Sequence, residues 1–419
     1  MKLKLHWLRW TLAATTVATA AMSTAQIGTG GAPTGHRSKL MPVPARPHPP
    51  PGGNGTQFGD PVVGLTAEQQ AAFSEGREEF ESIETAEGGL GPIFNNDSCA
   101  VCHSTPLSGG ASAIVETRFG RSRHGQFDPL ANLGGSLLQQ FATNPIALEH
   151  VPTEANVVAK RLTTPLFGAG LIEAIPDAEI AMNALRRQPD GVNGRASRVL
   201  DPASGTMRVG RFGWKEQHAS LLGFAADAYL NEMGVTSRLF PTENAPNGDQ
   251  ALLAKVLTTT GINDPPNPVT GRGDIDASAD FMRLLGPPPP VTLTSAAVAG
   301  QQLFDQLKCT ACHLPMMISG ESPVHALAFK TVPLYSDLLL HDMGALGDGI
   351  VQGPAGAREM RTAPLWGLRA RGPFLHDGRA SSVNDAVLAH DGEGAAARER
   401  YRQLSSAELR QLLAFLNSI

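Results

Sequence analysis

Two short segments of the sequence combine cysteine and histidine in a pattern that can attach a cofactor covalently. Residues 99–103 read Cys-Ala-Val-Cys-His and residues 309–313 read Cys-Thr-Ala-Cys-His, and together they use all 4 cysteines of the 419-residue chain. In such a segment the two thiols can form thioether bonds to one porphyrin, and the histidine can bind its iron. The sequence therefore predicts two covalently bound haem c groups, attached at Cys99, Cys102, Cys309 and Cys312, with His103 and His313 as iron ligands.

The spacing of the four cysteines fits zinc, redox and disulfide chemistry less well. A zinc site built from two Cys-x-x-Cys pairs would place the pairs much closer in sequence. A thioredoxin-like redox pair needs no histidine directly after it, and it would not be expected twice. Short disulfide loops would leave both histidines as a coincidence.

The N-terminus has the features of an export signal. Basic residues at positions 2, 4 and 9 precede an apolar stretch over 10–22, and residues 23–25 (Ser-Thr-Ala) are small enough for a cleavage site. We expect residues 1–25 to be a cleaved signal peptide and the mature protein to be periplasmic. The apolar stretch is too short for a membrane span, and no later segment approaches one.

The rest of the chain divides by composition. Residues 26–60 are rich in glycine and proline and predict a flexible tether. The segment Gly-Pro-Pro-Pro-Pro at 286–290 breaks helical structure and makes a natural boundary. We therefore predict an N-terminal haem domain over 61–286, on the substrate side, and a C-terminal cytochrome c-like domain over 291–419, on the electron-transfer side.

The two halves repeat one plan. Residues 72–80 and 296–304 precede the two cysteine segments, predict amphipathic helices and share the pattern Gly-x-x-x-Phe. Residues 163–168 (Thr-Thr-Pro-Leu-Phe-Gly) and 362–367 (Thr-Ala-Pro-Leu-Trp-Gly) follow them in the same order. The predicted fold class is mainly α, with two cytochrome c-like haem domains in tandem and long Gly/Pro-rich loops.

Three further helices are predicted. Ser405 with Glu408 forms a capping box before a leucine stripe, and Ser382 with Asp385 marks the start of a helix that ends near His390. Residues 215–232 form a third predicted helix.

The residues themselves leave several candidates for the remaining iron ligands and for proton transfer. The sixth ligand of the second iron could be His390, Met343, His341 or His376. No such residue stands out for the first haem, since His124 and His150 lie in loop-like stretches. Glu173 is the one carboxylate in an apolar run, where burial would raise its pKa and suit it to move protons, although it could equally be structural. Trp214 and Trp366 could relay electrons or simply pack in the core.

Several longer strings together resemble the dihaem oxidoreductase (putative peroxidase) family, relatives of the bacterial dihaem cytochrome c peroxidases. The resemblance runs from about residue 65 to 419 and is carried by residues 89–95, 128–135, 211–215, 339–344 and 373–380. It implies a two-domain fold with one c-type haem in each domain.

The resemblance also implies a ligand for the second iron. In the peroxidases a His-x-Gly is followed 14 residues later by a ligating methionine, and the same count from His376 reaches His390. We therefore favour His390 over Met343 and expect a bis-histidine second haem, which is similar to the related dihaem rubber oxygenases. The segments around Glu173 and from 214 to 229 resemble those that line the distal pocket, so Glu173 and Trp214 are the expected catalytic residues.

From the residues and the resemblance together we expect a periplasmic dihaem oxidoreductase with peroxidase-like activity. Peroxide or another small oxidant would be reduced at the first haem, with electrons arriving through the second haem from a small cytochrome c or cupredoxin. Two alternatives stay open, a non-catalytic electron-transfer cytochrome and a dihaem oxygenase that acts on an organic substrate. The net charge of −5 shows no basic patch for nucleic acid. Calcium is compatible with the sequence, but no residue can be assigned to it.

Overall fold

The computed structural model describes residues 57–419, apart from 258, 260 and 290. The predicted signal peptide and most of the predicted tether therefore lie outside the described residues. The helices of the described part are α1 (Ala67–Glu81), α2 (Cys99–Cys102), α3 (Ala169–Glu173), α4 (Asp177–Asn183), α5 (Leu221–Met233), α6 (Gln250–Val256), α7 (Asp274–Leu284), α8 (Ser295–Gln306), α9 (Val383–Leu388), α10 (Ala395–Arg402) and α11 (Ser406–Leu416). The strands are β1 (Ile93–Phe94), β2 (Val115–Arg123), β3 (Gln126–Asp128), β4 (Leu137–Leu138), β5 (Phe141–Ala142), β6 (Val157–Leu162), β7 (Arg198–Asp201), β8 (Thr206–Val209), β9 (Met317–Ile318), β10 (Thr331–Val332), β11 (Leu340–Asp342) and β12 (Glu359–Arg361).

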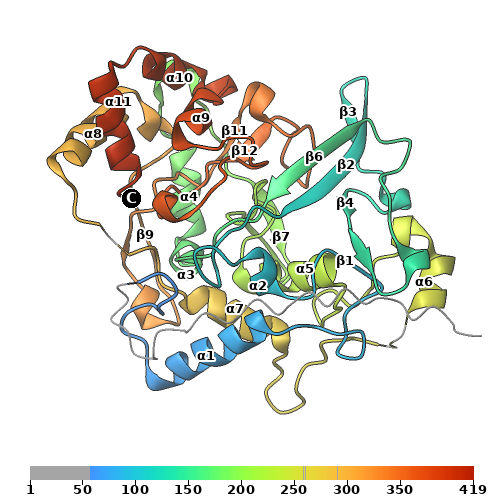
Figure 1. Cartoon of the computed structure of the whole chain (residues 1–419). Helices are drawn as coiled ribbons and strands as arrows, with labels where there is room; N and C mark the ends of the chain where they lie inside the picture. The colour runs from blue at the N-terminus through green and yellow to red at the C-terminus, as the bar shows by residue number, and fades with distance from the viewer. Residues whose placement is uncertain (1–56, 258, 260, 290) are drawn as a thin grey trace, which may run out of the picture. The chain divides into compact units, whose positions relative to one another are not determined.

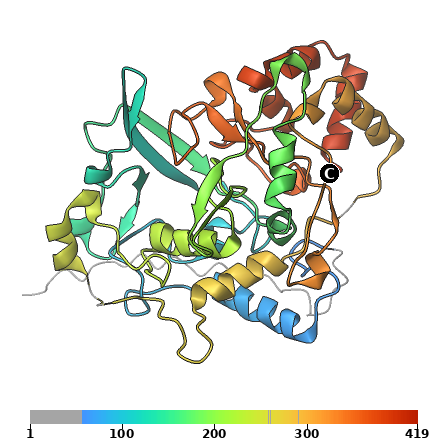
Figure 2. The same ribbon diagram turned by 180° about the vertical axis from the view of Figure 1, so that it is seen from behind.

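The fold is mixed and mostly helical. The helices of the predicted mainly α class are present, but the structure also contains β-strands that this class does not include. An antiparallel sheet, in which β2 pairs with β3, β4 and β6, was not predicted. Below it α5, α7 and α1 follow one another, as Figures 1 and 2 show from opposite sides.

The sheet could not be predicted from the sequence pattern, because its two long strands, β2 and β6, carry charged residues on a buried face. Along β2, Thr117 and Phe119 are buried on one side, whereas Glu116 and Arg118 on the other side face a cavity. A strand buried on both faces but polar on one shows no clean alternation of apolar and polar residues.

The predicted repeat has a structural counterpart in two closely packed helix pairs, α1 with α7 and α8 with α11. A Cβ atom on Gly76 would lie 2.3 Å from the carbonyl oxygen of Ala277, and one on Gly300 would lie 2.0 Å from that of Gln411. No side chain fits at either position, so the glycine of the Gly-x-x-x-Phe pattern is what allows each pair to approach.

The phenylalanine of the same pattern then packs across the pair. Phe80 meets Phe281 with ring centroids 4.8 Å apart, and Phe304 meets Phe415 at 5.4 Å. In both halves the partner phenylalanine lies four residues after the residue whose carbonyl touches the glycine. The two halves are therefore built on the same helix-pair contact.

The glycines that end the second repeated string also correspond. Gly168 and Gly367 have φ values of 73° and 74°, and each directly precedes a short helical segment. This left-handed conformation favours glycine at both places.

The capping signals at the C-terminal end are confirmed. Ser405 forms a capping box with Glu408 at the start of α11, and Ser382 accepts a hydrogen bond at the start of α9. The helix predicted over 215–232 is partly wrong, because α5 begins at Leu221 after its N-cap, Ser220. Residues before it fold as an irregular loop that is tied to other segments.

Three hydrophobic clusters lie in the described part of the chain, two large ones and a small one formed by Ile93, Ala147 and Val256. The first large cluster consists mainly of residues before 286 but includes Met317, Leu334 and Trp366 from the second half, and the second is built around α8 and α11. Trp366 thus packs in a core, over Gly168. The domain boundary at 286–290 stays a prediction. The first large cluster crosses it, because it contains residues from both sides of 286–290.

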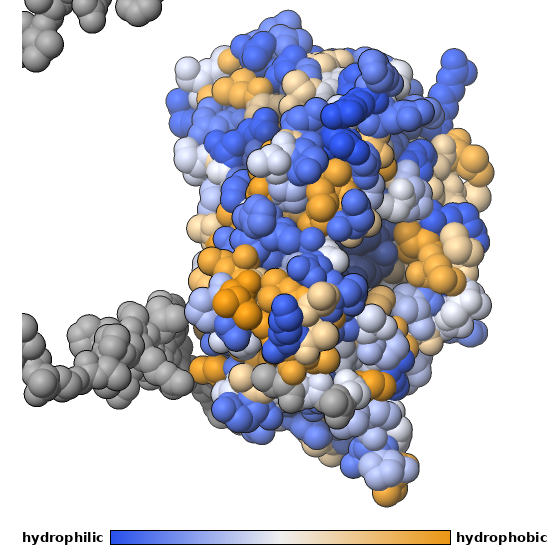
Figure 3. Space-filling view, turned by 90° about the vertical axis from the view of Figure 1, so that its right-hand side faces the viewer, coloured by the Kyte–Doolittle hydropathy of each residue, from blue (hydrophilic) through white to orange (hydrophobic). Residues whose placement is uncertain are grey.

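Hydrophobic side chains on the face seen in Figure 3 form several separate groups among hydrophilic ones. Among the residues that the structure describes, no helix is both long enough and apolar enough to cross a membrane.

Replacing Gly300 with alanine should destabilise the protein, because the new methyl group must displace the backbone of α11. We expect a loss of about 1–3 kcal/mol in the free energy of unfolding, which denaturant unfolding of the haem-loaded protein would measure. Gln302→Ala, on the exposed side of α8, is the matched control. Equal stability of G300A and the wild type would show that this close contact does not exist.

Candidate haem sites

Each cysteine segment folds as one turn of helix. The first forms α2, where the backbone N–H of His103 donates to the Cys99 carbonyl (3.0 Å). The second begins as a 3-10 turn, and the N–H of His313 donates to the Cys309 carbonyl (2.9 Å). Residues three and four positions apart share one face of a helical turn. The spacing therefore directs two thiols and one imidazole to the same side.

The four thiols are not set up as reactive thiolates. Burial raises the pKa of Cys99 to about 12, of Cys102 to about 11 and of Cys309 to about 12, and it also raises that of Cys312. A redox or nucleophilic cysteine needs a lowered pKa. The four thiols therefore do not fit a redox or nucleophilic role.

Both histidines of these segments are held with one ring nitrogen free. The Nδ1 atom of His103 lies 3.1 Å from the Gly110 carbonyl oxygen, and that of His313 lies 3.0 Å from the Tyr335 carbonyl oxygen. A carbonyl only accepts, so Nδ1 carries the proton and Nε2 keeps its lone pair. Burial lowers the pKa of His103 to about 4 and that of His313 to about 3, which keeps both rings neutral and able to bind a metal.

The repeated phenylalanine lies beside each of these imidazoles. Phe80 and His103 have ring centroids 5.8 Å apart, and Phe304 and His313 have them 6.3 Å apart. The helix-pair contact thus positions the histidine directly in both halves.

Each segment opens into its own cavity. The first cavity is lined by Cys99, Cys102 and His103. The second cavity is lined by Cys309, Cys312 and His313. Each cavity therefore has two thiols and one imidazole on its wall, which is where a haem attached to them would lie.

The second cavity places a second histidine opposite His313. The rings of His313 and His390 have centroids 6.4 Å apart, and Nδ1 of His390 lies 2.8 Å from the Ala386 carbonyl oxygen. Two metal–nitrogen bonds of about 2 Å each, together with the two ring radii, span close to this separation. The geometry therefore suits one iron held between two Nε2 atoms.

His341 cannot serve as that ligand. Its Nε2 atom lies 3.0 Å from Asp337 and its Nδ1 atom 2.7 Å from Glu393. Burial alone would lower the pKa of His341, but its hydrogen bonds to Asp337, Cys312 and Glu393 outweigh burial and raise the pKa to about 12. The ring is a buried cation without a free lone pair.

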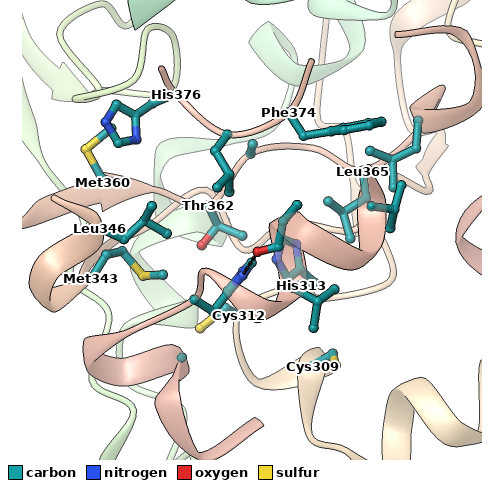
Figure 4. A pocket seen from close by; sticks show the side chains of 18 of the residues that line it. Cys309, Cys312, His313, Met343, Leu346, Met360, Thr362, Leu365, Phe374 and His376 are labelled. Carbon is teal, nitrogen blue, oxygen red and sulfur yellow. Dashed lines mark hydrogen bonds between the residues drawn. The ribbon is translucent and has the colours of Figure 1, made fainter. Parts of the chain in front are cut away.

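The remaining two candidates, Met343 and His376, also line the second cavity. Met343 lies with Leu346 and Met360 on one side of the second cavity, away from Phe374 (Figure 4). His376 meets Trp214 edge-on at 6.2 Å. Met343 thus stays the alternative ligand, and the ring-to-ring geometry favours His390.

Two arginines in the second cavity provide a test of whether its residues fit a porphyrin. Arg371 donates from Nη2 to the Pro364 carbonyl (2.9 Å), but its buried Nε has no hydrogen-bond partner among the described residues. Arg361 also lines the cavity, and burial lowers the pKa of both arginines to about 10, which leaves them charged. An anionic ligand would satisfy the unpaired Nε. A porphyrin carries two carboxylates, so the residues fit this group.

The first cavity is polar and contains a pair of carboxyl groups. Arg118 from β2 donates to both oxygens of Glu116 (2.8 and 3.0 Å), and Glu116 is hydrogen-bonded to Glu232 on α5. Burial and the charge of Glu116 raise the pKa of Glu232 to about 8. Two carboxyl groups can hydrogen-bond only if one is protonated. Glu232 is therefore a neutral acid beside an ionised, arginine-paired carboxylate.

A histidine missed by the sequence reasoning also lines the first cavity. His218 has its Nε2 atom 3.3 Å from Asp227, and its ring stacks on Phe224 at 5.3 Å. Helical spacing could have indicated Glu232, because it lies eight residues after Phe224 on one face of α5. No local signal distinguishes His218, which precedes the helix.

Glu173 does not line either cavity. Its carboxylate accepts the backbone N–H of Leu221 (2.7 Å) and pairs with Arg283 (2.7 Å). The geometry gives it a structural role at the start of α5, and its predicted catalytic role has no support in these contacts.

Trp214 lies where the two cavities meet. It lines both of them together with Leu162 and Thr163, and its indole N–H donates to the Leu162 carbonyl (2.8 Å). The structure thus brings Trp214 next to both predicted haem sites.

A family model described as "Di-haem oxidoreductase, putative peroxidase" matches residues 153–419, more than half of the sequence. The chain belongs to this family. The predicted family is thereby confirmed, and the protein is a dihaem oxidoreductase whose family implies two haems and two cytochrome c domains. No curated protein shows significant similarity to the sequence.

Solved structures show weaker likeness. Hydrazine synthase from Kuenenia stuttgartiensis has 15% identity and a TM-score of 0.39, and the match covers 96% of this chain and 100% of that one. A MauG-like protein associated with microbial copper homeostasis has 15% identity and a TM-score of 0.38, over 86% and 92% of the two chains. The dihaem peroxidase BthA from Burkholderia thailandensis has 12% identity and a TM-score of 0.38, over 83% and 85%.

Replacing His390 with alanine should turn the second haem high-spin, because its iron loses one of two axial nitrogens. Absorption and electron paramagnetic resonance spectra would show the change. Met343→Ala is the matched variant and should leave this haem low-spin. The reverse pattern would mean that Met343 is the ligand.

Replacing Glu232 with glutamine should make stability less dependent on pH. In the unfolded chain the carboxyl group loses its proton near its ordinary pKa of 4.5, whereas in the native protein it keeps the proton to about 8. Between these values the native state binds more protons, so the free energy of unfolding falls as pH rises. The free energy of unfolding of E232Q minus that of the wild type should therefore be more favourable to E232Q at about pH 9 than at about pH 5.

Denaturant unfolding at the two pH values would measure this difference, with the exposed Glu75→Gln as control. If the wild type and E232Q changed in parallel with pH, Glu232 would not hold a proton in the native state.

Proposed function

We propose that this protein is an exported dihaem peroxidase whose haems are both of the covalent c type. Thioether bonds would form at the two cysteine pairs, with His103 and His313 as proximal ligands. Support comes from the repeated helical turn and from the Nδ1 hydrogen bond of each histidine, which leaves the lone pair on Nε2. The N-terminal export signal fits a periplasmic location.

The two cavities support different tasks for the two haems. His390 faces His313 in the second cavity, which would leave that iron without an open position and suit it to electron transfer. Among the described residues that line the first cavity, the other histidine is His218, and its Nε2 atom lies 3.3 Å from Asp227. With that nitrogen engaged by a carboxylate, the first haem would keep a position for peroxide.

The observation that carries the proposal is the pair of Glu232 and Glu116, with Arg118 bound to Glu116, in the first cavity, where the raised pKa of Glu232 makes it the proton donor of the pair. Reduction of hydrogen peroxide to two molecules of water consumes two electrons and two protons. Glu232 and Glu116 share one proton, so they can accept a proton from one peroxide oxygen and return it to the other. Arg118 keeps Glu116 ionised and holds it in place.

The haem would supply the iron that binds peroxide and the electrons that reduce it. Trp214 would connect the two haems, since it lines both cavities. A small periplasmic donor, a cytochrome c or a cupredoxin, would deliver electrons to the second haem.

Steady-state reduction of peroxide by a reduced small cytochrome tests this proposal. We expect turnover, and a fall in kcat of about 10²-fold or more in E232Q because the amide cannot transfer a proton. Glu173→Gln separates the structure-based from the sequence-based assignment. Loss of activity in E173Q but not in E232Q would return the proton-transfer role to Glu173.

Carbon monoxide binding to the reduced protein distinguishes the alternatives. A peroxidase should bind it at one haem, whereas a protein that binds none and reduces no peroxide would be an electron-transfer cytochrome. Turnover of an organic compound with oxygen, without peroxide, would instead indicate an oxygenase.

A further inference from the structure

The residues that lie between the two cavities are tied to a buried cluster of charges. We call Leu162, Thr163 and Trp214 the bridge, because these three residues line both cavities. Each end of the bridge has a charged neighbour in sequence, Arg161 before Leu162 and Lys215 after Trp214. The side chain of Lys215 is 0% exposed and that of Arg161 is 1% exposed.

The ammonium group of Lys215 lies in a cage of oxygen atoms from the C-terminal half. Its Nζ atom donates to the carbonyl oxygens of Gly356 (2.9 Å) and Glu359 (2.6 Å) and lies 3.0 Å from Oδ1 of Asp348. An ammonium has three N–H donors, and four acceptors surround it here, because the Ala357 carbonyl oxygen also lies 3.5 Å away. The cage thus replaces the water that burial removes.

Asp348 connects this ammonium with the other end of the bridge. Its Oδ2 atom accepts from Nε of Arg161 (2.8 Å), while Oδ1 faces Lys215. Arg161 also donates from Nη1 to Gln352 (2.6 Å). Burial alone would raise the pKa of Asp348, but the two cations outweigh it and lower the pKa. One carboxylate, which is 0% exposed, therefore serves both charged neighbours of the bridge.

The backbone around Trp214 is fixed from the same direction. The N–H of Arg361 donates to the Trp214 carbonyl (2.9 Å), and its guanidinium donates to the carbonyl of Gly213 (2.8 Å). Lys215, Trp214 and Gly213 are thus each bound to residues between 348 and 361. Such ties fix the tryptophan relative to the C-terminal half, which contains the second haem site.

A buried ammonium is expensive to desolvate, and an apolar side chain would often stabilise the fold as well. A buried Lys215 is therefore better explained by the position in which it holds the neighbouring Trp214 than by a gain in stability. We propose that Lys215 is a positioning residue, whose ammonium, shared with Asp348 and Arg161, fixes Trp214 between the two haems for electron transfer. This inference rests on the proposed function, in which Trp214 connects the haems.

Electron transfer between the haems, measured by flash photolysis of the half-reduced, carbon monoxide-bound protein, tests the inference. We expect Lys215→Ala to slow this step at least about tenfold, since small misplacements of a positioned group are costly. Added n-propylammonium, which can refill the cage, should restore the rate. The exposed Lys255→Ala in α6 is the matched control and should behave like the wild type.

A merely structural role would give a different result. K215A would then melt at a lower temperature, yet it would transfer electrons at the wild-type rate, and the inference would be wrong. If K215A does not accumulate with its haems, Asp348→Asn provides the second variant, and an unchanged rate in D348N would equally overturn the inference. Trp214→Phe separates the claim that Trp214 relays electrons from the claim that Lys215 positions it. A wild-type rate in W214F contradicts the relay itself, whereas a slow W214F with a normal K215A contradicts only the role of Lys215.

Discussion

One constraint underlies both halves of this protein, the helical turn that directs two thiols and an imidazole to the same face. A pair of helices packs behind each turn. Gly76 and Gly300 have no side chain, so the backbone of one helix in each pair comes into direct contact with that of the other. The phenylalanine that follows each glycine packs against the histidine of the turn. The turn that is predicted to attach a haem and the close helix contact behind it therefore form one repeated unit.

The two cavities beside these turns differ in chemistry. The second has a histidine on each side and two buried arginines, which suits a haem that keeps its ligands while it passes electrons. The first has the turn that carries His103 on one side, and it also contains the neutral acid Glu232 beside the carboxylate of Glu116. This pair suits the transfer of protons. Trp214 lines both cavities, so under the proposed function electrons and protons would reach the first haem from neighbouring residues.

Local patterns predicted much of this arrangement. The cysteine turns, the Gly-x-x-x-Phe helices and the caps at Ser382 and Ser405 depend on neighbouring residues and could be inferred from the sequence. The carboxyl pair proposed to transfer protons could not be inferred, because Glu116 and Glu232 meet only through the pairing of β2 with β6 and the packing of α5. Glu173 attracted attention as a carboxylate in an apolar run, but its partner Arg283 is 110 residues away in sequence.

The most direct measurement of the central claim is the intact mass of the mature protein isolated from a host that attaches haem c. The account predicts the mass of the chain from Gln26 plus two haems that persist under denaturing conditions. A mass with one added haem, or with none, would contradict it.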